Sequence, residues 1–214
     1  MTPPPPLDNT VHLGDCVAFM KTLPDKCVDF VCTEPPYGID FGYDQHDDNF
    51  EGWKRLMGAC IPEWLRICRG PIVFPSCSND ALVWLFANYP PKWMMAWYNG
   101  SPGHRSAIGF NDWEPLFVLG EKIHRNTHDH FYAKPTDAHI DWHPCPKSME
   151  YAKTLITKFS DEGDLVFDPF GGSGTTFLAA AQGNRRYLGC ELSPAYHAKI
   201  LQRLELETAQ GKMF

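Results

Sequence analysis

The stretch that decides the fold is Leu165-Val166-Phe167-Asp168-Pro169-Phe170-Gly171-Gly172-Ser173-Gly174-Thr175-Thr176. The pattern predicts a buried strand that ends at Asp168, a turn rich in glycine, and a helix that begins at Thr175. Glycine accepts positive φ angles and lets a ligand approach the backbone closely. Turns of this kind often bind nothing, so the stretch alone is weak support for a binding site.

Two carboxylates indicate what the turn would hold. Glu191 ends the next predicted strand, where a carboxylate can accept hydrogen bonds from ribose hydroxyls. Asp168 places a negative charge beside the turn, which disfavours a pyrophosphate and suits a cationic ligand. No lysine follows the glycines, so the pattern is not a Walker loop. A ribose joined to a cationic amino acid describes S-adenosylmethionine (SAM) better than it describes NAD.

A second stretch, Cys32-Thr33-Glu34-Pro35-Pro36-Tyr37-Gly38, follows another predicted strand. Its prolines fix a turn that presents the Glu34 carboxylate, the Pro35 carbonyl and the Tyr37 ring to one place. An amino group on a heteroaromatic ring is a poor nucleophile, because its lone pair is delocalised. Two acceptors can draw that group toward tetrahedral geometry while the tyrosine stacks on the base. Taken alone, Pro-Pro-Tyr is more often a structural turn.

Strands and helices alternate along the chain, which predicts an α/β fold with a mostly parallel sheet covered on both faces. The predicted strands are 11–14, 28–32, 71–75, 92–98, 113–119, 164–167 and 186–190. The predicted helices are 16–23, 53–68, 80–88, 147–159, 175–182 and 194–210. Strands 92–98 and 113–119 are expected to form a hairpin at the edge of the sheet.

Together the two motifs resemble Asp-Pro-Pro-Tyr and Phe-x-Gly-x-Gly, the hallmarks of the amino-group DNA methyltransferases. Here Glu34-Pro35-Pro36-Tyr37 precedes Phe170-Gly171-Gly172-Ser173-Gly174, which is the order of the permuted β-group of adenine-N6 and cytosine-N4 enzymes. Leu13-Gly14-Asp15-Cys16 is similar to the segment in which an Asp and the next amide contact the SAM adenine. His143-Pro144-Cys145-Pro146-Lys147 resembles the segment that flanks the methionine end of SAM, and Trp113–Leu119 matches a strand of the group.

The resemblance runs from about Val11 to Leu204 and implies a single methyltransferase domain over residues 1–214. It implies a Rossmann-like SAM-methyltransferase fold of seven strands, six parallel and one antiparallel, with the strands of Asp168 and Glu34 as neighbours. The implied catalytic residues are Glu34, Pro35, Pro36 and Tyr37. The implied SAM-binding residues are Asp15, Cys16, His143, Lys147, Asp168, Phe170, Gly171, Gly172, Ser173, Gly174, Thr175 and Glu191.

Glu34 departs from the family, which has Asp, Asn or Ser at this position. With the backbone in place, the extra methylene moves the carboxylate by more than about 1 Å, and a misplacement of that size can lower a rate on the order of 100-fold. Three interpretations are open: a working variant with a reshaped pocket, a weakened enzyme, or a substitution introduced by design. The chemistry needs only an acceptor oxygen, so we retain the interpretation as an enzyme.

The resemblance implies a solitary cytoplasmic enzyme that methylates a flipped base in double-stranded DNA. Adenine N6 is favoured over cytosine N4, because the cytosine group usually has Ser before Pro-Pro-Tyr. An RNA or protein amide methyltransferase remains an alternative, as does a catalytically impaired SAM-binding and DNA-binding subunit. Only residues 120–142 stand in place of a large target-recognition domain. A short recognition sequence, a homodimer or a specificity partner would each compensate for so short a segment.

The formal net charge of −7 opposes binding to phosphates unless the cations gather on one face. Three pairs of cations are candidates for such a face: Arg66 and Arg69, Lys122 and Arg125, and Arg185 and Arg186. Residues 1–9 are predicted to be a flexible, proline-rich tail without a secretory signal, and no apolar run is long enough for a membrane span.

The cysteines and histidines predict neither disulfides nor a metal site. The eight cysteines are scattered without a C-x-x-C pair, which is typical of buried reduced thiols in a cytosolic protein. Five histidines, His124, His128, His130, His139 and His143, fit no familiar zinc pattern. Their segment is predicted to be a surface loop, which either contacts DNA, closes over the site or is merely solvated.

Overall fold

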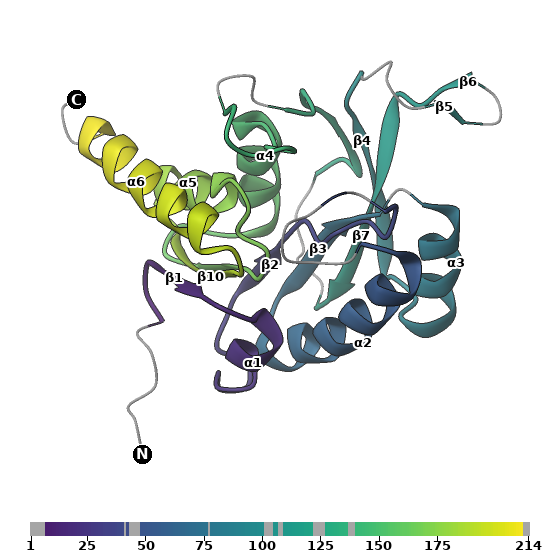
Figure 1. Cartoon of the computed structure of the whole chain (residues 1–214), viewed down its shortest axis with the longest axis horizontal. Helices are drawn as coiled ribbons and strands as arrows, with labels where there is room; N and C mark the ends of the chain where they lie inside the picture. The colour runs from purple at the N-terminus through teal and green to yellow at the C-terminus, as the bar shows by residue number, and fades with distance from the viewer. Residues whose placement is uncertain are drawn as a thin grey trace.

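The computed structural model describes residues 7–40, 42, 48–76, 78–100, 105–106, 109–121, 127–136 and 140–211. An eight-stranded sheet forms the centre of the molecule, and helices cover both of its faces (Figure 1). In sheet order the strands are β1 (Thr10–Leu13), β10 (Arg186–Glu191), β9 (Leu165–Asp168), β2 (Phe30–Cys32), β3 (Pro71–Pro75), β7 (Trp113–Gly120), β4 (Trp93–Tyr98) and β8 (His130–Tyr132). A separate small sheet pairs β5 (Arg105–Ser106) with β6 (Gly109–Phe110).

The helices form one layer on each side of the sheet. They are α1 (Cys16–Met20), α2 (Phe50–Ile67), α3 (Asn79–Asn88), α4 (Met149–Phe159), α5 (Thr175–Gln182) and α6 (Pro194–Gly211). Helices α1, α2 and α3 pack on one face, and α4, α5 and α6 pack on the other. The predicted α/β class with helices on both faces is confirmed.

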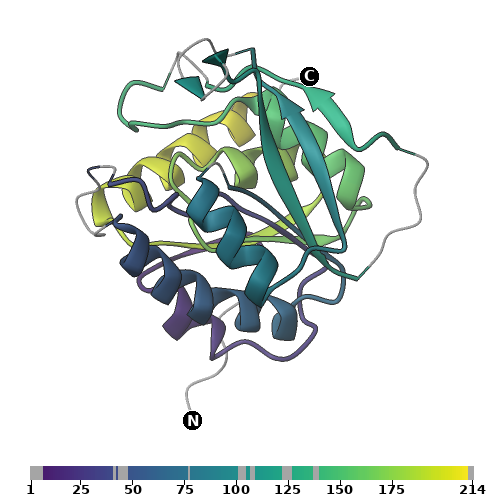
Figure 2. The ribbon, with the colours of Figure 1, turned by 90° about the vertical axis from the view of Figure 1, so that its right-hand side faces the viewer.

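Strand direction agrees with the prediction, but the number of strands does not. Only β7 runs antiparallel to its neighbours β3 and β4, and every other pairing in the main sheet is parallel. Figure 2 shows the long pair β4 and β7, in teal, facing the viewer. The pair is not at the sheet edge, because β8 adds an eighth strand beyond β4. The segment 120–142 is therefore not loop throughout.

The continuous apolar runs of the central strands reflect burial on both faces. All five residues of β3 are buried. Ile72 and Phe74 face the layer of α2, whereas Val73 between them faces the layer of α4. The same period of two sends Phe167 to the first layer and Val166 to the second.

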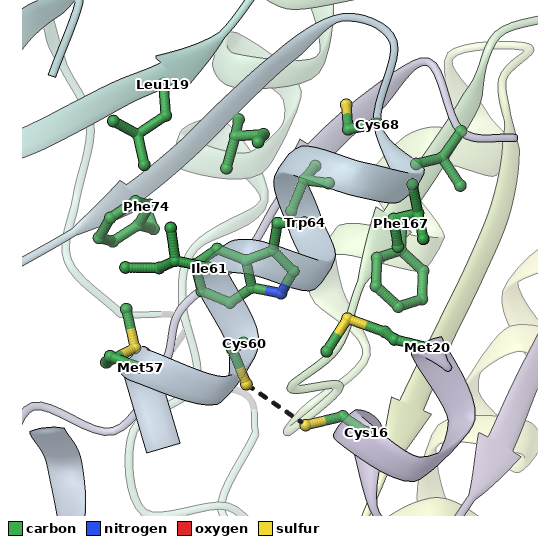
Figure 3. Close-up of a cluster of buried hydrophobic side chains, with 14 of the residues drawn as sticks. Cys16, Met20, Met57, Cys60, Ile61, Trp64, Cys68, Phe74, Leu119 and Phe167 are labelled. Atoms are coloured by element: carbon green, nitrogen blue, oxygen red, sulfur yellow. Dashed lines mark hydrogen bonds between the residues drawn. The ribbon is translucent and has the colours of Figure 1, made fainter. Parts of the chain in front are cut away.

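Helix α2 buries one stripe of its surface against the sheet. Its N-cap Asn49 accepts a hydrogen bond from the Gly52 backbone N–H, which satisfies one of the free donors of the first turn. The buried residues recur at helical spacing: Trp53, Met57, Cys60, Ile61, Trp64 and Ile67. In Figure 3, Ile61 and Trp64 of this helix lie between Phe74 and Phe167 of the sheet.

The predicted tail is wrong at its C-terminal end. Leu7 packs against the core, and Asp8 forms an ion pair of 2.7 Å with Arg186. The Asn9 side chain accepts a hydrogen bond from the Tyr187 backbone N–H at 3.2 Å. These contacts fix residues 7–9 to the start of β10, and residues 1–6 lie outside the described part of the chain.

The seven cysteines that the structure describes are all free. Five of them are buried, Cys27 is half-buried and Cys145 is exposed, whereas Cys77 lies outside the described residues. The sulfur atoms of Cys16 and Cys60 lie 3.9 Å apart in the core (Figure 3). Among the helices described, none has the length and apolar character required to cross a membrane.

Candidate active site

A cavity of about 820 Å³ opens at the edge of the sheet where the parallel strands end. Open α/β sheets bind ligands at this edge, beyond the carboxyl ends of the strands. Every predicted catalytic and SAM-binding residue lines the cavity except Gly174. Gly174 has a φ of 77° and lies under Ile200, so it serves the turn into α5. The individual binding roles remain predictions.

The glycine turn is fixed to the end of β10. The Gly171 backbone N–H donates to the Cys190 carbonyl at 2.7 Å, and the Gly172 N–H donates to Oε2 of Glu191 at 2.7 Å. Gly172 has a φ of 53°, and a Cβ there would lie 3.2 Å from Nε2 of His143. The conformation and this close approach both favour glycine.

Asp168, the last residue of β9, connects the glycine turn to the second motif. Its Oδ1 accepts hydrogen bonds from Oγ1 of Thr33 at 2.6 Å and from the Phe170 N–H at 3.0 Å. Since β9 and β2 are neighbours, the two motifs meet directly despite their separation in sequence. No described lysine or arginine pairs with Asp168, and burial raises its pKa to about 7.

Glu34 and Lys147 form the polar centre of the other half of the cavity. Nζ of Lys147 lies 2.7 Å from Oε2 of Glu34 and 3.2 Å from the Tyr37 hydroxyl. Oε1 of Glu34 is buried and has no hydrogen-bond partner among the described residues. Burial raises the pKa of Glu34, and the Lys147 ammonium opposes that rise. The second motif thus presents a buried carboxylate oxygen that accepts no hydrogen bond from the described residues.

Three residues that the sequence analysis did not single out complete this half. The hydroxyl of Tyr151 and Oε2 of Glu114 are also buried without a hydrogen-bond partner in the described structure. Asn99 donates to Oε1 of Glu114 at 2.8 Å. In the sequence, only Glu114 could have been recognised as a site residue, because its charge interrupts an apolar strand. Tyr151 looks in sequence like any core residue of α4.

The cations proposed to contact DNA lie away from the cavity wherever they are described. Arg69 pairs with Asp29 just before β2, and Arg186 pairs with Asp8 at the start of β10. Arg66 and Arg185 donate to backbone carbonyls near the same edge. These four residues lie near the amino ends of the strands, and none of them lines the cavity. Lys122 and Arg125 lie outside the described residues.

Sequence relatives of this chain are bacterial methylases. YubD of Escherichia coli (strain K12), which is named as a methylase, is 30% identical over 217 residues, spanning 89% of this chain and 88% of YubD. The model of the DNA methylase family, N6_N4_Mtase, matches residues 97–202. The chain belongs to the N6/N4 DNA methylase family. The resemblance of the two motifs is thereby confirmed.

Other relatives of this methylase differ in the base that they are named for. YhdJ of Escherichia coli (strain K12), named a DNA adenine methyltransferase, is 24% identical and spans 92% of this chain and 83% of its own. The PvuII DNA methyltransferase, named cytosine-N4-specific, has a TM-score of 0.72 at 15% identity, over 92% of this chain and 86% of that one. TTHA0409 of Thermus thermophilus in complex with SAM has a TM-score of 0.69 at 22% identity, over 93% and 94% of the chains. These structures confirm the SAM-methyltransferase fold.

SAM is the methyl donor of this methylase family, and the cavity suits its charge. Asp168 and Glu191 are buried carboxylates at the glycine turn, and neither forms an ion pair with a described lysine or arginine. The ring of His143 stands beside the turn, and burial lowers its pKa to about 4, so it is neutral at pH 7. Carboxylates without a counter-ion stabilise a cationic ligand and disfavour a phosphate.

The raised pKa of Asp168 predicts that SAM binding by the methylase depends on pH. Below pH 7 the carboxyl is mostly protonated, and a cationic ligand favours its ionised form. The SAM affinity should therefore rise with pH, by up to about tenfold per unit below pH 7, and level off above it. Calorimetry across this range measures the effect, with Asp168→Asn as the control that binds weakly and without this dependence. A flat profile for the unmodified protein would contradict the role of Asp168.

Proposed function

We propose that the protein transfers a methyl group from SAM to the N6 amino group of an adenine in double-stranded DNA. The observation that carries the proposal is the Oε1 atom of Glu34, which is buried in the cavity wall without a partner among the described residues. Asp168, at the SAM turn, reaches this motif through Thr33. The methyl donor and the base that receives the methyl group would thus share one site, as direct transfer between two bound molecules requires.

The residues of the second motif act on the amino group of the base. Oε1 of Glu34 and the Pro35 carbonyl accept its two hydrogens, which draws the nitrogen lone pair out of the ring system. Tyr37 stacks on the face of the base. SAM, when bound, would supply the electrophilic methyl group: the N–C bond forms as the C–S bond breaks, the product leaves as a neutral thioether, and the methylated nitrogen releases one proton to solvent. The base must leave the duplex to reach the cavity, at a cost of a few kcal/mol.

Adenine is favoured by the chemistry of the residue before Pro-Pro-Tyr. A carboxylate stands there in this chain and in the adenine enzymes that the motif resembles, whereas the cytosine-N4 enzymes usually have Ser. YhdJ, which is named a DNA adenine methyltransferase, supports the proposal. The second candidate is transfer to cytosine N4, and the similar fold of the PvuII enzyme, named cytosine-N4-specific, is the observation that favours it. The short segment 120–142 leaves site selection to a short recognition sequence, a second copy or a partner subunit.

The test measures transfer of tritium from methyl-labelled SAM to three substrates: duplex DNA, single-stranded DNA and RNA. We expect label in duplex DNA, and recovery of N6-methyladenine as the labelled base after digestion to nucleosides. Recovery of N4-methylcytosine would replace the proposed base with the second candidate. Label in RNA alone, or SAM binding without transfer to any substrate, would overturn the proposed function.

A further inference from the structure

The ammonium group of Lys147 is enclosed within the base half of the cavity. Besides Glu34 and the Tyr37 hydroxyl, it lies 5.3 Å from the centre of the Tyr37 ring and 5.6 Å from that of Trp97. Only 18% of its side chain is exposed. One carboxylate and two aromatic faces thus surround this cation, an arrangement that stabilises a charge away from water.

The backbone around Lys147 is fixed at several points. Its carbonyl accepts a hydrogen bond from Oγ1 of Thr175 at 3.2 Å, at the first residue of α5. Ser148 caps α4 and donates its hydroxyl to the Lys134 carbonyl at 2.6 Å. The main chain that carries Lys147 is therefore anchored to both α4 and α5.

The family resemblance implies that the segment 143–147 flanks the methionine end of SAM. Within this segment, the ammonium of Lys147 contacts Glu34 and Tyr37 of the second motif. A cation is also poorly suited to the neighbourhood of a sulfonium, since like charges repel. The contacts favour a role beside the base.

We propose that Lys147 is a positioning residue that holds Oε2 of Glu34, so that Oε1 remains as the acceptor for the amino group of the base. The inference rests on the proposed function, because it assigns the ion pair a purpose in that reaction. A glutamate has one more rotatable bond than the aspartate of the family motif. The ion pair restrains that freedom, which lets the longer side chain serve as a fixed acceptor.

The charges around Glu34 give the ion pair a second effect. Burial and Glu114 raise the pKa of Glu34, whereas Lys147 and, to a smaller extent, the Tyr151 hydroxyl lower it. The other titratable groups that interact with Glu34 are Asp168, Cys32 and Cys145. Lys147 is the cation of this group, so its ammonium favours the ionised form of the acceptor and opposes the rise in its pKa.

The first experiment compares single-turnover methylation by Lys147→Met, Lys147→Arg and the unmodified protein at saturating SAM. Lys147→Met should lower the rate on the order of 100-fold with SAM affinity nearly unchanged, since misplacement of a reacting group has that effect. Its residual rate should rise with pH, because Glu34 without the cation ionises only at higher pH. Lys147→Arg keeps the charge and should recover part of the rate.

Two controls separate this role from a structural one. Lys153→Met alters an exposed lysine of α4, the helix that follows Lys147, and should leave the rate unchanged. In a Glu34→Ala background, Lys147→Met should cause little further loss, because the residue acts through Glu34. Equal losses in both backgrounds, or a lowered SAM affinity that accounts for the whole effect, would overturn the inference.

Infrared spectroscopy tests the inference without catalysis. Relative to the unmodified protein, Lys147→Met should gain a carbonyl band of a protonated carboxylic acid at neutral pH beyond any band from Asp168, and adding Glu34→Gln to that variant should remove the gain. If the unmodified protein methylates no DNA, the proposed function fails while this band still reports on the ion pair. Absence of the band in a folded Lys147→Met protein, or in Lys147→Gln should the first variant not fold, would overturn the role of the lysine.

Discussion

Glu34→Ala is expected to lower the single-turnover methylation rate by about 100- to 1,000-fold, which corresponds to roughly 2.7–4 kcal/mol. The change removes the buried Oε1 acceptor of the cavity and also leaves Lys147 without its anionic partner. Glu34→Gln serves as a second variant, because it keeps the shape and one carbonyl oxygen. SAM affinity should change little in either protein, since Glu34 lies on the base side.

Glu34→Asp decides which interpretation of the unusual glutamate is correct. If the pocket is built for glutamate, the shorter side chain retreats from the amino group and from Lys147, 2.7 Å away at present, and the rate falls modestly. If glutamate impairs the site, restoring aspartate should raise the rate on the order of 100-fold. Equal rates for the unmodified protein and Glu34→Ala, both above background, would exclude the carboxylate from the chemistry.

Trp64→Ala is expected to lower the free energy of unfolding by about 3–5 kcal/mol, the range for truncating a fully buried aromatic residue. The indole packs 5.4 Å from the Phe74 ring and 6.4 Å from that of Phe170, between the sheet and the SAM turn. Its Nε1 is buried without a partner in the described structure. Trp64→Phe removes that unpaired donor along with some volume, so it should be much less destabilising.

Urea unfolding followed by circular dichroism measures these changes. Val83→Ala is the matched control, because 71% of Val83 is exposed on α3 and surface changes of this kind stay within about 0.5 kcal/mol. SAM affinity should fall in Trp64→Ala beyond what unfolding explains, since Phe170 loses its support. A loss of stability below that of the control would show that the core repacks without the indole.

The central elements could be predicted because apolar periodicity and turn residues agree there. The strand 71–75 and the helix 175–182 have the predicted bounds, and the ends of the other main strands differ by a few residues. The edge strand β8 was missed because only Phe131 is buried in it, with His130 and Tyr132 exposed on either side. Three residues are too few to establish a period of two.

Motifs predicted which residues gather at the cavity, but not how they pair. The hydrogen bond from Thr33 to Asp168 and the ion pair of Lys147 with Glu34 join residues far apart in sequence. Such pairings depend on strand order and helix docking, which local pattern does not encode. The tail was misjudged for the same reason, since Asp8 gains its order from Arg186 at the other end of the chain.

The strand order determines when the enzyme can be completed as it is synthesised. β9 and β10 lie between β1 and β2, and β1 pairs with β10 alone in the sheet. A nascent chain that has not yet produced residues 165–191 therefore holds β1 without a neighbour and β2 with one open edge, a surface prone to aggregation. The two halves of the cavity can therefore meet only after residues 165–191 have joined the sheet. A nascent chain that ends before residue 165 presents Glu34 but lacks the glycine turn.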